Sequence, residues 1–151
     1  MRPSPNLVVK EYYWADKDDY FMTASPTEQA LLESRAIGGW LATGHSFEAW
    51  DSPVAGSVAV CRFVGDWTIA VESGKAKGPD THFYTADAQE CASVPVRWPV
   101  WILETSAAFH VLPGTGASCA TSTVPVLRLF HPGDLPTHRF LANAATAMAF
   151  A

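Results

Sequence analysis

Two pairs of basic side chains recur at matching places in the sequence. Arg62 and His82 stand on two short segments that read as the strands of a hairpin, and Arg128 and His138 occupy the corresponding places further along. In a structural interpretation, each Arg bridges the hairpin to a neighbouring part of the chain and each His closes a strand end. In a functional interpretation, each pair lines a ligand pocket together with an aromatic side chain such as Tyr84. The residue types alone leave both interpretations open.

Tryptophan side chains are the second group of candidates for binding. A ring that lies half exposed at a turn can stack on the C–H face of a sugar while polar groups hold the hydroxyls. Trp50 and Trp101 are the two that we select as ligand-binding residues, and the alternative is that most of the rings fill the core of a small domain. Five of the 6 Trp lie near predicted turns or strand ends: Trp14, Trp50, Trp67, Trp98 and Trp101.

The sequence contains none of the common spacing motifs for catalysis. A Gly-x-Ser-x-Gly elbow, a His-Glu-x-x-His zinc motif, a phosphate loop and a dinucleotide fingerprint are all missing. His131 and His138 lack metal-ligand spacing, and the acidic run at residues 16–19 lacks the Gly and distal Glu of an EF-hand. We therefore expect a protein that is not an enzyme and uses no metal or other cofactor. An enzyme of unrecognised type is the alternative.

Length and charge narrow the range of partners. The 151 residues suit one domain, and 10 Lys plus Arg against 15 Asp plus Glu give a net charge of -5. Nucleic acid is not expected as a partner, because a phosphate backbone gains little from such a charge. Membrane insertion is not expected either, since no run reaches the ~20 apolar residues that span a bilayer. The first residues lack the apolar run of an export signal, so export would need a signal from outside this sequence.

Three predicted hairpins position the basic pairs. Each consists of a short segment rich in apolar residues, a turn and a second short strand. The paired segments are residues 9–13 with 20–23, 60–64 with 82–85, and 126–130 with 138–141.

A helix-capping residue follows each predicted hairpin at the same offset. Ser25, Asp87 and Asn143 each come two residues after the second strand. A short side-chain oxygen at such a position accepts hydrogen bonds from the free N–H groups of a first helical turn. The helices predicted from these caps cover residues 26–37, residues 88 to about 95, and residues 144–151.

Returning strands complete the predicted architecture. The first two helices are each followed by a Trp and a predicted strand, whereas the third has no counterpart. Its apolar side, with Met148 and Phe150, therefore needs a cover from a partner, a continuation of the chain or residues 7–9. The predicted fold class is α+β, a single domain over residues 1–151 made of three hairpin-helix repeat units in a pseudo-threefold arrangement, the third incomplete. The units cover about residues 8–56, 57–123 and 124–151.

These features resemble a repeat family of unknown function that occurs mostly in bacterial and fungal exported proteins. Its units read roughly Val-Tyr-Arg-Phe-Tyr, then His-Phe-Tyr-Thr, a capped helix and Gly-Trp. The second unit of this chain matches best, at residues 60–63 and 81–87, while the first matches loosely because Glu11 replaces the Arg and Tyr20 replaces the His. In the functional interpretation, these two replacements abolish ligand binding in the pocket of the first unit.

The resemblance also implies a disulfide and a location. Members of the family often carry cysteines at the positions of Cys61, Cys91 and Cys119, which implies a disulfide between Cys61 and Cys91 with Cys119 left over. Three reduced cysteines are the alternative. A disulfide suits an oxidising compartment, and the family is mostly exported, so the implied location is secreted or at the cell surface.

The expected function is a non-catalytic exported module for binding or adhesion, with carbohydrate or a cell-surface polymer as its ligand. This expectation combines the missing catalytic motifs with the family resemblance. The alternative is a structural subunit of a larger assembly, in which a protein partner covers the incomplete third unit. Oligomer contacts would then form through the C-terminal helix.

Overall fold

The first sheet of the computed structural model has β1 (Leu7–Trp14) as its middle strand. The structure describes residues 2–65, 81–115, 118–132 and 136–142, and three further residues at 145, 148 and 149. β1 pairs antiparallel with β2 (Asp19–Thr23) along one edge and with β3 (Leu41–Ala49) along the other. The short 3-10 helix η1 (Ala15–Lys17) connects β1 to β2, and α1 (Pro26–Glu33) lies between β2 and β3 in the chain.

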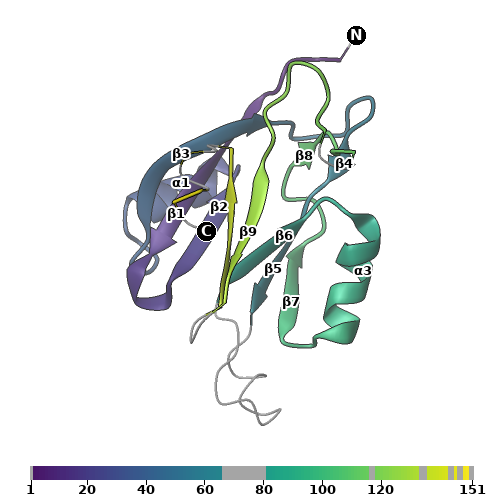
Figure 1. Cartoon of the computed structure of the whole chain (residues 1–151). Helices are drawn as coiled ribbons and strands as arrows, with labels where there is room; N and C mark the ends of the chain where they lie inside the picture. Colours follow the sequence, from purple (N-terminus) through teal and green to yellow (C-terminus); the bar gives the residue numbers. More distant parts are fainter. Residues whose placement is uncertain are drawn as a thin grey trace.

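A second three-stranded sheet has the same strand order. Its middle strand β5 (Cys61–Gly65) pairs antiparallel with β6 (His82–Thr85) and with β7 (Trp101–Thr105), and α3 (Ala88–Arg97) lies between β6 and β7 in the chain. The remaining strands form two pairs, β4 (Val58–Ala59) with β8 (His110–Val111), and β9 (Leu127–His131) with β10 (Thr137–Leu141). Figure 1 shows the β9–β10 hairpin between the two larger sheets, where β10 contacts both β2 and β6.

The predicted α+β fold of three hairpin-helix units is wrong. Over the described residues the chain is mostly β, with 43% strand and 19% helix, and it forms four small antiparallel sheets and two helices. The helices are short because their ends are fixed locally. α1 stops at Glu33, since Arg35 adopts a φ of 59° and the N–H groups of Arg35 and Ala36 bond back to Leu32 and Leu31. The third predicted cap, Asn143, and most of the third predicted helix lie outside the described residues.

The two described helix caps are confirmed. The Ser25 hydroxyl accepts a hydrogen bond from the Glu28 N–H at 3.2 Å, and Pro26 occupies the first helical position. Asp87 Oδ1 accepts from the N–H groups of Gln89 and Glu90 at 2.8 and 3.0 Å. Each cap fixes the start of a helix, and therefore also places the Glu three residues later on the first turn.

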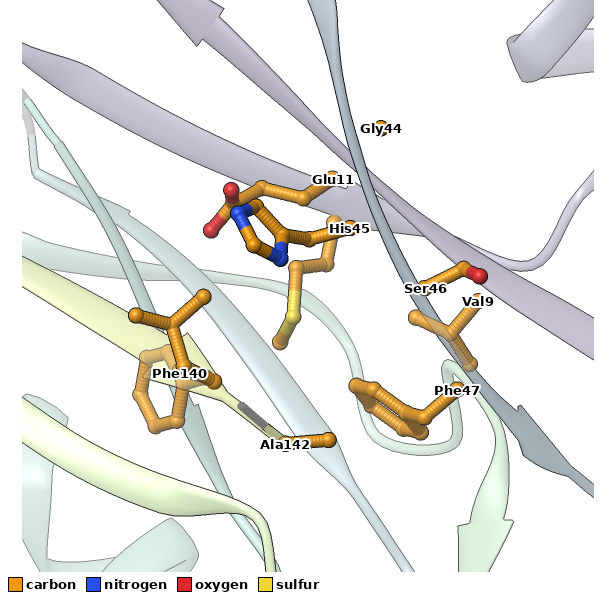
Figure 2. Close-up of a pocket in the computed structure, with 10 residues that line it drawn as sticks. Val9, Glu11, Gly44, His45, Ser46, Phe47, Phe140 and Ala142 are labelled. Carbon is orange, nitrogen blue, oxygen red and sulfur yellow. The ribbon is translucent and has the colours of Figure 1, made fainter. Parts of the chain in front are cut away.

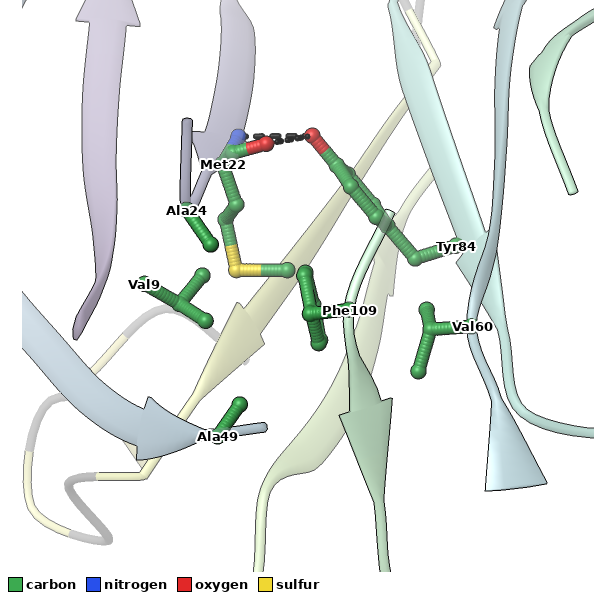
Figure 3. Close-up of a cluster of buried hydrophobic side chains, with 7 residues drawn as sticks. All are labelled: Val9, Met22, Ala24, Ala49, Val60, Tyr84 and Phe109. Carbon is green, nitrogen blue, oxygen red and sulfur yellow. Dashed lines mark hydrogen bonds between the residues drawn. The ribbon is translucent and has the colours of Figure 1, made fainter. Parts of the chain in front are cut away.

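Side chains from both three-stranded sheets meet in one core cluster (Figure 3). The Tyr84 hydroxyl donates to the Met22 carbonyl at 2.7 Å and accepts from the Met22 N–H at 2.6 Å. Because Met22 and Tyr84 are both buried, these bonds satisfy a donor and an acceptor that water does not reach, and they fasten β6 to β2. The cluster comprises Val9, Met22, Ala24, Ala49, Val60, Tyr84 and Phe109.

Candidate functional site

Arg62 is clamped inside the molecule. Its Nη1 and Nη2 donate to the two carboxylate oxygens of Glu28 in α1, each at 3.2 Å, and its Nε donates to Glu104 in β7 at 3.1 Å. The guanidinium lies 4.8 Å from the ring centroid of Phe21 in β2. Its side chain is only 11% exposed, so Arg62 joins β5 to α1 and β7 and is not available to an external ligand.

His82 is held between two carboxylates. Its Nδ1 lies 2.8 Å from Asp19 Oδ2, and its Nε2 lies 3.2 Å from Glu104 Oε1. Burial alone would lower the pKa of His82, but the hydrogen bonds to Asp19 and Glu104 outweigh it and raise the pKa to about 9. The ring also packs against Phe21 and Trp40. His82 is therefore a charged structural residue at neutral pH.

The pH dependence of stability should report this His82 site. Because the pKa in the folded state, about 9, lies above the ordinary value of 6.5, the folded state binds the proton more tightly. The stabilisation is complete below pH 6.5 and is lost as the pH rises to 9, a loss of about 3 kcal/mol at ~1.4 kcal/mol per pKa unit. Urea unfolding at pH 6.5 and pH 9 measures it, and a H82Q variant should lose this dependence. Equal stability of the native protein at the two pH values would contradict the assignment.

Arg128 and His138 lie in a more open setting. Arg128 Nη1 donates to Glu90 Oε1 in α3 at 2.7 Å, and its guanidinium lies 5.3 Å from the ring centroid of Phe83. Its side chain remains 47% exposed. Among the described residues, His138 Nδ1 is buried without a hydrogen-bond partner. Burial, and then the charge of Arg128, lower the pKa of His138 to about 4, so this imidazole is neutral at pH 7.

The structure therefore separates the seven predicted ligand-binding residues. His82 and Tyr84 are buried, the Arg62 side chain is 11% exposed, and all three are bonded inside the molecule. Trp101 is half buried and packs on Phe83 and His138. Trp50 stands apart from these residues and donates through Nε1 to the Pro3 carbonyl at 2.9 Å. Of the seven, Trp50 and Arg128 are placed where a ligand reaches them.

A large cavity, which we call the groove, is lined by both of these residues and by the buried Tyr84. It has a volume of about 1190 Å³ and opens between the N-terminal segment, the end of β3, the junction of β6 and α3, and residues 111–114 and 118–128. Sequence reasoning selected Trp50, Tyr84 and Arg128 but did not predict that they line one cavity, because this depends on how distant parts of the chain are brought together. Its lining includes the rings of Phe47, Trp50 and Phe109 and the charged groups of Asp87, Glu90 and Arg128.

A smaller cavity of about 260 Å³ contains Glu11 and His45 (Figure 2). Glu11 is only 3% exposed, and both of its carboxylate oxygens accept hydrogen bonds from Arg139, at 2.8 and 3.0 Å. The Thr43 hydroxyl adds a third bond at 2.7 Å, and Arg139 lies 4.3 Å from the ring centroid of Tyr20. Glu11 is thus committed to a buried ion pair, and the two residues that depart from the repeat pattern, Glu11 and Tyr20, together hold Arg139.

A disulfide joins Cys61 in β5 to Cys91 in α3, with the Cα atoms 6.1 Å apart. This is the pair that the family resemblance implies. Cys119 is a free, exposed cysteine.

Two kinds of feature are missing from the described residues. None of the described helices combines the length and the apolar character needed to cross a membrane. In the same parts of the chain, three or more His, Cys, Asp or Glu side chains do not converge on a point where a metal ion could bind.

No protein-family model, curated protein or solved structure matches this chain. The resemblance to the exported repeat family therefore stays a prediction. The fold and the site define the protein as a small, mostly β protein with one large open groove among its described residues.

Proposed function

We propose that this protein is a non-catalytic binding module that holds an extended polymer, in particular a polysaccharide, in the groove. The observation that carries this proposal is the Trp50 ring on the lining of a cavity of about 1190 Å³. That volume exceeds the roughly 300–1,000 Å³ of ordinary small-molecule pockets and is suited to several linked units of a polymer. The Trp50 and Phe47 rings offer apolar surface for sugar faces, and nearby charged groups can bond to hydroxyls.

The charged groups of the groove suit binding better than proton transfer. Asp87 caps α3 through Oδ1, and Glu90 pairs with Arg128. Burial tends to raise the pKa of Glu90, but its hydrogen bonds to Arg128 and Thr85 and the charge of Arg128 together outweigh burial and lower that pKa. A carboxylate that stays ionised and paired positions a ligand and is a poor general acid. The Cys61–Cys91 disulfide supports an exported location, either secreted or at the cell surface, because such bonds persist in oxidising compartments.

A polysaccharide array tests the groove directly. We expect the labelled protein to bind at least one class of polysaccharide, and W50A to bind about tenfold or more weakly, since an aromatic anchor contributes on the order of 1–3 kcal/mol. Trp98 is the matched control, because it is 48% exposed at the end of α3 and does not line the groove. W98A should bind like the native protein. Absence of binding to every polysaccharide, or equal losses in the two variants, would refute the proposal.

A second candidate function, that of a subunit in a larger assembly, is favoured by β9. Among the described residues β9 pairs with β10 alone, and four of its five residues are exposed. An exposed strand edge of this kind is a surface for pairing with another polypeptide.

A further inference from the structure

The outer edge of β9 lacks a neighbour that the other two middle strands have. β1 lies between β2 and β3, and β5 lies between β6 and β7, whereas β9 pairs only with β10 in the part of the chain that the structure describes. β5 buries every second residue, but in β9 only Leu129 is even partly buried. Leu127 is 40% exposed and Phe130 is 55% exposed. An extended segment beside β9 would cover apolar surface and form backbone hydrogen bonds.

The third strand of each complete sheet supplies a polar partner to the middle strand. In the second sheet the register shifts between Arg62 and Phe63, and Glu104 of β7 bonds there to Arg62 Nε and to His82 Nε2. In the first sheet the register shifts between Lys10 and Tyr12, and the Thr43 hydroxyl of β3 bonds to Glu11. In each sheet, the pairing of the middle strand with the third strand is therefore irregular at the charged residue of the middle strand. A side chain of the third strand completes the hydrogen bonding of that residue.

Arg128 and His138 repeat part of the surroundings of Arg62 and His82, but among the described residues Arg128 has no counterpart of Glu104 and His138 Nδ1 has no counterpart of Asp19. Arg62 bonds to a Glu on the first turn of α1 and lies over Phe21, and Arg128 likewise bonds to Glu90 of α3 and lies over Phe83. Each His packs on the same Phe as its Arg. Within the described residues, Glu90 is the one carboxylate in contact with Arg128, and nothing stands in the place that Glu104 takes beside Arg62.

We propose that the outer edge of β9 binds an extended, antiparallel segment of a partner protein that places a Glu or Asp against Arg128 and His138. Apolar residues beside this acid would cover Leu127 and Phe130. A second copy of β9 is not the occupant, because the sequence of β9, Leu-Arg-Leu-Phe-His, has no acidic residue. The inference rests on the second candidate function, and the proposed edge site shares Leu127 and Arg128 with the lining of the groove.

Binding should be coupled to protonation of His138. The groups that face this imidazole are Arg128, Glu90 and the rings of Phe83, Phe130 and Trp101, and its pKa of about 4 leaves it neutral. A carboxylate placed as Glu104 is beside His82 favours the charged form. The complex should therefore take up a proton. The affinity should fall by up to ~tenfold per pH unit as the pH rises from the pKa of His138 in the free protein to its higher pKa in the complex.

A peptide with the sequence of residues 99–107, which contains β7 and Glu104, is the probe. It is titrated into the isotope-labelled full chain and followed by NMR. We expect shift changes on the amides of β9 and on the His138 ring, with a rise in the pKa of His138. The same peptide with E104Q should bind tenfold or more weakly, and so should the native peptide to the R128Q variant. R97Q is the matched control, because Arg97 is an exposed residue at the end of α3.

Three results would overturn the proposal: no shift on β9, equal binding of the Glu and Gln peptides, or shifts on β5 showing that the peptide replaces the chain's own β7. Self-association of the free protein through β9, detected by sedimentation and unaffected by R128Q, would also overturn it by assigning the edge to a second copy. Because Arg128 also lines the groove, W50A distinguishes the two proposals: it should weaken polysaccharide binding and leave peptide binding at β9 unchanged.

Discussion

Replacing Arg139 with Met should lower the free energy of unfolding by about 3–5 kcal/mol, because it leaves the buried Glu11 carboxylate without a counter-charge. Arg139 and Glu11 are 8% and 3% exposed, and two hydrogen bonds of 2.8 and 3.0 Å connect them. The pair joins β10 to β1, and its two residues are 128 positions apart in the sequence. Urea unfolding monitored by tryptophan fluorescence measures the change.

Two further variants distinguish the cost in stability of leaving a buried charge unpaired from the cost of losing an ion pair. R128M removes the exposed Arg128–Glu90 pair, whose side chains are 47% and 32% exposed, and should cost less than about 1 kcal/mol. The double variant E11L/R139M removes both buried charges and should recover much of the stability that R139M loses, since apolar replacement of a buried pair is often close to neutral. A cost for R139M as small as that for R128M would show that Glu11 is hydrated or protonated in the folded protein.

Local signals predicted the start of each described helix correctly. The caps at Ser25 and Asp87 act through hydrogen bonds two or three residues away, so the information lies within a few residues. The fold class could not be reached in the same way. Pairings such as β4 with β8 and the contacts of β10 with β2 and β6 depend on residues far apart in sequence, and a single sequence carries little signal for them.

The polar network around Arg62 and His82 could not be predicted from local sequence either. The sequence singled out Arg62 and His82 but not their partners Asp19, Glu28 and Glu104, which lie 22 to 63 positions away. One signal was available: a Glu stands three residues after the caps at Ser25 and Asp87, and each of these two Glu side chains bonds to an Arg of the next hairpin.

The Glu11–Arg139 pair corresponds to two departures from the repeat pattern, which can be connected only once the structure is known. Glu11 stands where the repeat pattern has Arg, and Arg139 stands where the second hairpin has Phe83. Taken singly, each departure suggests a degenerate unit. Taken together, they are two opposite charges that compensate each other in the interior, and their proximity follows only once β10 is placed beside the first sheet.

Removing the Cys61–Cys91 disulfide should lower the free energy of unfolding by about 3–4 kcal/mol, because the bond closes a loop with a sequence separation of 30 and so restricts the unfolded chain. The bond also fastens α3 to β5, beside the buried side chains of Phe63, Phe83 and Val94. A C61A/C91A variant, compared with the native protein by urea unfolding under oxidising conditions, measures the effect.

Cys119 provides the matched control for this measurement. It is free and exposed, so C119S should change the free energy of unfolding by less than about 0.5 kcal/mol. Adding a reductant should lower the stability of the native protein and of C119S alike, and leave C61A/C91A unchanged, because only the first two carry the disulfide. If unfolding of the unreduced native protein yields three thiols that react with a thiol reagent, the bond is not formed in solution. The disulfide would then no longer support the proposed exported location.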